Sequence, residues 1–172
     1  MNTRNDMSWL IPDATPVGWR SKCFGAAQHD RTVAELVAAG TSLHNLPTPV
    51  LTLDAAAVEH NISVMNTFLK QSGAELAPHG KTTMAPQLWQ RQLAAGAWGI
   101  TVATPWQLRV AVHFGVKRIQ HANAVLDPAE LGSFAQMLND DPELEIFVWV
   151  DSPESAALTR RGYEGSTRPL NV

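Results

Sequence analysis

The stretch Trp98-Gly99-Ile100-Thr101-Val102-Ala103-Thr104-Pro105 decides the fold of this chain, because it joins a strand directly to a helix. The apolar run 98–102 is typical of a buried strand. Thr104 can cap a helix that Pro105 opens, and Gly115 is placed to end that helix just after Phe114. A strand followed at once by a capped helix is the repeating unit of a parallel α/β sheet.

The same unit recurs on both sides of this stretch. Short β-rich runs predict further strands at 49–53, 75–79, 117–121, 145–150 and 169–172. Helical patterns follow them, opening at Asp54, Pro86, Asp127 and Ser152-Pro153. The clearest start is Asp127-Pro128-Ala129-Glu130, which has the form of a capping box with proline at the first helical position. Short connections between alternating strands and helices imply α/β architecture, with a parallel sheet and right-handed crossovers.

The repeat begins at residue 47, so we divide the chain into an N-terminal extension, 1–46, and a βα portion, 47–172. The extension contains one predicted helix, 32–39, stopped by Gly40. A barrel needs eight βα units and about 250 residues, whereas an open sheet is complete with about five or six strands. Because the sequence stops within the apolar run 169–172, we expect the front portion of a longer protein. A short C-terminal edge strand is the alternative.

The composition is that of a soluble globular protein, with 45% hydrophobic residues and a formal net charge of −3. The 13 Lys and Arg residues are scattered and outnumbered by 16 Asp and Glu, which argues against a nucleic-acid partner. No run is long and apolar enough to suggest a membrane span, and the first residues resemble no targeting signal, so we expect a cytoplasmic protein. The single cysteine, Cys23, excludes an intrachain disulfide, and we interpret it as incidental.

One lysine lies where parallel α/β folds bind their ligands. The run Pro78-His79-Gly80-Lys81-Thr82-Thr83 delivers Lys81 just past a predicted strand. Ligands of parallel sheets and barrels bind outside the carboxyl ends of the strands. If the extended conformation continues through Lys81, then His79 and Lys81 project to the same side. An imidazole and an amine would then share one pocket.

Three interpretations compete for Lys81. Gly80-Lys81-Thr82 matches the end of the phosphate-binding pattern G-x-x-x-x-G-K-[ST], but Glu75 occupies the first glycine position and Pro78 has no N–H for a phosphate. The second interpretation is Schiff-base chemistry, in which a desolvated lysine attacks a carbonyl such as that of pyridoxal phosphate. The third is a solvated loop residue. These arguments leave the second and third open.

The segments 77–86 and 92–104 resemble the D-threonine aldolase and D-serine dehydratase family, and most closely its amino acid deaminase branch. The family carries a Pro-His-x-Lys-Thr signature, found here at 78–82. A preceding T-P-x-x-x-x-D segment and a following G-x-x-G-[IL]-x-V-A-T segment match 48–54 and 96–104 in order and spacing. Asn123 and Asp151 also correspond to family positions, so that the resemblance covers about residues 46–172.

The resemblance implies the fold that alanine racemase typifies, a (β/α)₈ barrel that holds pyridoxal phosphate, with a C-terminal β-domain. Lys81 would be the lysine that forms the Schiff base. His79 would lie beside the cofactor, and Thr104 and Asn123 would lie on strand ends that face it. The run 49–53 would then belong with the β-domain, and the chain would hold about four barrel strands and the start of a fifth.

The chain departs from the family at two positions and leaves several family features unassigned. Many relatives have Arg and Glu where this chain has Ala77 and Gln107. The phosphate-binding loops and the metal-binding pair would fall beyond Val172, so a divalent metal, Zn or Mn, is expected only in the full-length protein. The histidines show no metal-ligand spacing, and His121, which ends a predicted strand, could face the pocket.

The leading hypothesis for the full-length protein is a pyridoxal-phosphate-dependent lyase acting on D-3-hydroxy amino acids, by deamination or by retro-aldol cleavage. The alternative is a non-catalytic pyridoxal-phosphate carrier of the same barrel fold. We expect the chain as given to be inactive. An open half-barrel would expose strand edges and apolar helix faces, which predicts aggregation or dimerisation. A homodimer would also fit the two-chain sites that the resemblance implies.

Overall fold

The computed structural model describes residues 16–164 and 166–172. They belong to two compact units, 1–61 and 62–172, whose division falls within the helix α2 (Ala55–Ser72). This helix ends at Gly73, whose φ of +65° is a left-handed conformation that glycine adopts at low cost. The described residues contain no helix with the length and apolar character needed to cross a bilayer.

The first unit contains short helices and no regular strand within its described residues. These are η2 (Ala26–Gln28), α1 (Val33–Ala38) and η3 (Leu43–Asn45). The predicted helix at 32–39 is confirmed, and Thr32 and Glu35 form its capping box, with Thr32 N donating to Glu35 Oε2 at 2.7 Å. The strand predicted at 49–53 is wrong, because these residues pair with no neighbouring strand, and Leu51 and Leu53 are exposed.

The second unit is built on a parallel sheet of three strands in the order β1-β2-β3. The strands are β1 (Ile100–Val102), β2 (Arg118–His121) and β3 (Glu145–Val148). Ile100, Ile119 and Ile146 are in register across the sheet, as are Val102, His121 and Val148. The predicted α/β class and parallel pairing are confirmed. The complete barrel stays a prediction.

The strands predicted at 75–79 and 169–172 each form only a single bridge, one on either side of this sheet. His79 pairs with Thr101 next to β1, and Asn171 pairs with Phe147 next to β3, both in parallel orientation. The order of strand segments across the sheet therefore follows their order in the sequence. That order is the one expected when each strand returns through a helix to the next position.

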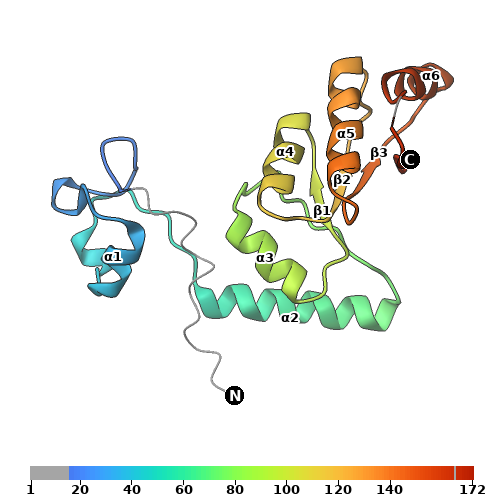
Figure 1. Cartoon of the computed structure of the whole chain (residues 1–172). Coiled ribbons are helices and arrows are strands. Elements are labelled where there is room, and N and C mark those ends of the chain that lie inside the picture. Colours follow the sequence, from blue (N-terminus) through green and yellow to red (C-terminus); the bar gives the residue numbers. More distant parts are fainter. Residues whose placement is uncertain (1–15, 165) are drawn as a thin grey trace. The chain divides into compact units, whose positions relative to one another are not determined.

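The four described helices that lie wholly within the second unit each begin at a proline, as the sequence predicted. They are α3 (Pro86–Ala94), α4 (Pro105–His113), α5 (Pro128–Asp140) and α6 (Pro153–Gly162). Figure 1 shows α4 and α5 standing along the sheet, and these helices contact its strands. Their fully buried side chains Leu108, Leu131 and Phe134 pack with the buried strand residues in one hydrophobic core.

Candidate functional site

The carboxyl ends of the parallel strands bring three of the predicted site residues to one edge of the sheet. Lys81 follows the bridge at His79, Thr104 follows β1, and Asn123 follows β2. Because neighbouring parallel strands point the same way, segments that follow them share the edge at which α/β folds bind ligands. The edge is therefore the candidate site.

The loop that carries Lys81 is held on the sheet by its backbone. Gly80 N and Lys81 N both donate to Thr101 O, at 2.8 and 3.3 Å. Gly80 O accepts from Met84 N at 2.9 Å and from the indole nitrogen of Trp89 at 3.3 Å. The side chain of Lys81 is exposed and makes no hydrogen bond or ion pair with any described residue. A firmly anchored backbone thus presents a free amine.

Gly80 has a steric reason to be glycine. A Cβ at this position would lie 2.6 Å from Ile100 Cγ2 and 2.7 Å from Trp89 Nε1. The chain also leaves the extended conformation here, since residues 80–83 form a turn. Strand alternation therefore does not extend from His79 to Lys81, and this argument for placing them in one pocket is lost. His79 is exposed, and its role as a cofactor contact stays a prediction.

Thr104 and Asn123 both brace the backbone that leaves β1. Thr104 Oγ1 accepts from Gln107 N at 3.2 Å, which caps α4, and Gln107 Oε1 accepts from Ala103 N at 2.9 Å. Asn123 Nδ2 donates to Ala103 O at 2.8 Å. The amide of Gln107 therefore serves a structural role that needs no charge. The hydroxyl proton of Thr104 and Oδ1 of Asn123 have no partner among the residues that the structure describes, so these are the groups they could offer a ligand.

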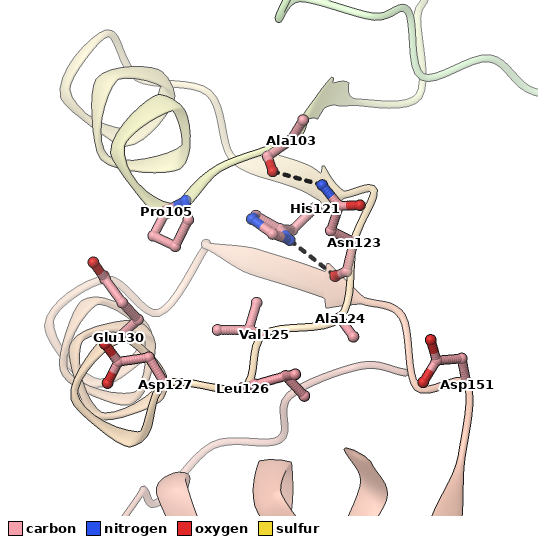
Figure 2. Close-up of a pocket in the computed structure, with 10 residues that line it drawn as sticks. All are labelled: Ala103, Pro105, His121, Asn123, Ala124, Val125, Leu126, Asp127, Glu130 and Asp151. Carbon is pink, nitrogen blue, oxygen red and sulfur yellow. Dashed lines mark hydrogen bonds between the residues drawn. The ribbon is translucent and has the colours of Figure 1, made fainter.

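A pocket of about 470 Å³ opens beside this edge (Figure 2). Its lining consists of Ala103, Pro105, His121, Asn123, Ala124, Val125, Leu126, Asp127, Glu130 and Asp151. Lys81 is not part of it. Asp127 Oδ1 accepts from Ala129 N at 2.8 Å and caps α5, while Glu130 pairs with Arg109 at 2.5 Å. The lining contains three carboxylates and, among the described residues, no lysine or arginine.

His121 is the unusual group of the pocket wall. Its side chain is 2% exposed, and its ring packs against Phe134 with centroids 5.9 Å apart. Nδ1 lies 3.0 Å from the carbonyl oxygen of Asn123, as Figure 2 shows. A carbonyl only accepts, so Nδ1 carries the proton and Nε2 keeps a lone pair. Nε2 is buried and has no partner in the described part of the chain.

Burial lowers the pKa of His121, and the hydrogen bond to Asn123 and the nearby Glu130 oppose that shift only in part. The neutral imidazole is therefore the form that the fold favours. The ring of His121 lines this pocket, while Nε2, the nitrogen that could act as a base, is hidden from solvent. That His121 faces the pocket of the cofactor stays a prediction. His121 was not among the predicted site residues.

The described residues fit one end of pyridoxal phosphate. The amine of Lys81 is unpaired and accessible, as attack on an aldehyde requires. The pocket does not fit the phosphate, since its carboxylates would repel a dianion and it offers no cation. The described residues also contain no cluster of three or more His, Cys, Asp or Glu side chains suited to a metal ion.

Comparison with known proteins finds relatives of two kinds. No family model matches the chain. The chain is 34% identical over 98 residues to a D-threonine aldolase of Arthrobacter sp, an alignment that covers 57% of this chain and 26% of that protein. It is 38% identical over 63 residues to a D-threo-3-hydroxyaspartate dehydratase of Delftia sp. (strain HT23), covering 37% of this chain and 17% of the relative.

A solved structure extends the match to the fold. The crystal structure of D-threonine aldolase from Filomicrobium marinum superposes with a TM-score of 0.67 at 25% sequence identity. The superposition covers 73% of this chain and 33% of that protein. Each alignment thus spans a third or less of the relative concerned.

Proposed function

We infer that this chain, which belongs to the D-threonine aldolase-like family, supplies the cofactor-binding lysine of a pyridoxal-phosphate-dependent lyase. The observation that carries the proposal is the free amine of Lys81 on an anchored loop at the carboxyl edge of a parallel sheet. The names of the two relatives share a substrate class, because threonine and 3-hydroxyaspartate both carry a hydroxyl on Cβ. A D-3-hydroxy amino acid is therefore the proposed substrate.

Lys81 has two tasks in this proposal. Its Nζ would hold the cofactor at the edge of the sheet through an imine with the cofactor's aldehyde, whose oxygen would leave as water. After the substrate amine displaces it, Nζ is again a free base and can accept or return a proton at that position. Pyridoxal phosphate, when bound, supplies the electron sink that makes bonds to Cα breakable.

The remaining edge residues orient rather than react. The hydroxyl of Thr104 can donate a hydrogen bond to a ligand, and Oδ1 of Asn123 can accept one. Thr104 Oγ1 and Asn123 Nδ2 already bond to the backbone. Both can fix a polar ligand beside Lys81 without altering the loop. The acidic pocket is therefore not the proposed site of the phosphate.

The two relatives differ in the bond that breaks. An aldolase cleaves Cα–Cβ, which turns D-threonine into glycine and acetaldehyde, and a dehydratase removes the Cβ hydroxyl, which leads to an oxo acid and ammonia. Neither outcome is favoured by the described residues. A divalent metal, Zn or Mn, that polarises the Cβ hydroxyl is part of the proposal, with ligands in other parts of the full-length protein.

The test has a binding arm and a product arm. The chain is mixed with pyridoxal phosphate, reduced with borohydride and digested, and we expect the label on Lys81. Lys81→Ala should lose the label, whereas Lys70→Ala, which removes an exposed lysine from α2, should keep it. In the full-length protein, D-threonine and D-threo-3-hydroxyaspartate are then assayed for acetaldehyde and for ammonia. An amount of label that is the same in Lys81→Ala as in the unaltered chain would reject the proposal.

A further inference from the structure

Both polar groups of the peptide that joins Gly80 to Lys81 are hydrogen-bonded. Its N–H, which belongs to Lys81, donates to Thr101 O at 3.3 Å. Its carbonyl, which belongs to Gly80, accepts from Met84 N at 2.9 Å and from Trp89 Nε1 at 3.3 Å. Two of these partners are backbone groups that any sequence would supply. The indole of Trp89 is the side chain that completes the set.

Trp89 reaches this peptide from inside the protein. It lies on α3, is 1% exposed and belongs to the hydrophobic core. A buried indole N–H that lacks an acceptor carries a desolvation penalty, and Gly80 O is the acceptor it finds. The missing Cβ of Gly80 is what allows this approach, since an added Cβ would lie 2.7 Å from Trp89 Nε1.

This arrangement connects the core to the reactive lysine. The core fixes the indole, the indole fixes the carbonyl of Gly80, and that carbonyl lies in the peptide plane that leads into the Cα of Lys81. The side chain of Lys81 meets no described partner that could hold it in place. Its direction therefore depends on the orientation of its backbone.

We propose that Trp89 is a positioning residue for Lys81, acting through the carbonyl of Gly80. The inference rests on the proposed function, since it gives Trp89 a role in forming the covalent bond between Lys81 and the cofactor. Loss of the indole N–H would leave the carbonyl of Gly80 held by Met84 N alone and widen the range of directions that Nζ samples. The aldehyde would then meet a correctly oriented amine less often.

The test compares Trp89→Phe with Trp19→Phe. Phenylalanine keeps an aromatic ring in the core and removes the donor, whereas Trp19 is 83% exposed and serves as the matched control. Each chain is mixed with pyridoxal phosphate and reduced with borohydride, and the label on Lys81 is measured relative to that on Lys70 and Lys117. We expect the selectivity for Lys81 to fall by about three- to tenfold in Trp89→Phe, as for the loss of one hydrogen bond. It should be unchanged in Trp19→Phe.

Two outcomes separate this inference from the function on which it rests. Equal labelling of Lys81, Lys70 and Lys117 in the unaltered chain would reject the proposed function. A selective unaltered chain with an equally selective Trp89→Phe variant would reject only the positioning role. A purely structural role of Trp89 would lower the unfolding midpoint without changing the selectivity of the folded fraction.

Gly80→Ala provides a second arm in case Trp89→Phe does not fold. The added methyl group crowds Ile100 and the indole, so it disturbs the same peptide without removing any core side chain. Unchanged selectivity in either variant with a native far-UV spectrum would overturn the proposal. If neither variant folds, both residues are structural and the positioning role is rejected.

Discussion

Replacing His121 with leucine should stabilise the protein. Its Nε2 is a buried acceptor with no partner among the described residues, and such a group costs about 1–3 kcal/mol. The substitution also removes the hydrogen bond from Nδ1 to Asn123 O, which contributes about 0.5–1.5 kcal/mol. Leucine suits a position that lies between Val102 and Val148 in the sheet and against Phe134. We therefore expect a net gain in unfolding free energy of about 1 kcal/mol at neutral pH.

The gain should grow as the pH falls. Burial lowers the pKa of His121 in the folded state, so the unfolded chain binds the proton more readily. The wild-type protein therefore has its full stability above the unfolded pKa of about 6.5 and loses stability as the pH drops below it. The loss is at most about 1.4 kcal/mol per pH unit for one proton. Leucine binds no proton, so the variant lacks this loss.

The measurement is urea unfolding followed by tryptophan fluorescence at pH 7.5 and pH 5.5. The matched control is His60→Gln, which removes an exposed histidine from α2 and should change neither the stability nor its pH dependence. A His121→Leu variant that is less stable than the wild type at pH 7.5 would refute the reasoning. So would a stability difference that stays the same at pH 5.5, because Nε2 would then have a partner or be open to water.

Three further substitutions test the packing and capping contacts around the site by the same unfolding measurement. Phe134→Ala empties the core beneath His121 and should cost about 3–5 kcal/mol, and a cost under about 1 kcal/mol would show that the core collapses around the gap. Thr104→Ala removes the cap of α4 and should cost about 1 kcal/mol, while Thr104→Ser should retain most of it; equal losses would mean that the methyl group matters and the cap does not. Gly99→Ala would bring a Cβ within 2.6 Å of Arg118 O between β1 and β2 and should cost about 1–3 kcal/mol by overpacking, so a neutral result would mean that the strands separate easily.

The sequence predicted those parts of the fold that depend on neighbours along the chain. Helix starts at Pro105, Pro128 and Pro153 are set by a cap residue and the proline that follows it, and all lie where expected. Strands β2 and β3 were also found, and β3 has the stronger apolar pattern. The run 49–53 has a similar pattern and forms no strand, because a strand exists only where another strand pairs with it.

In the candidate site, too, only the features set by neighbours along the chain could be predicted. Lys81 could be singled out, since its position after a strand is a local feature. The contact of Trp89 with Gly80 could not, because it depends on how α3 folds back onto the loop. The hidden nitrogen of His121 could not be predicted either, since alternation along a strand indicates a face but says nothing about which polar atoms find partners there. The pocket also joins Ala103 to Asp151, which only the sheet brings together.

In the proposed function, Lys81 binds an aldehyde cofactor at the carboxyl edge of the sheet. A crystal structure of the protein after treatment with pyridoxal phosphate and borohydride tests it most directly. We expect continuous electron density from Lys81 Nζ to the cofactor, with the loop at 80–84 still bonded to Thr101 and Trp89. An empty Lys81, or density joined to another lysine, would contradict the claim.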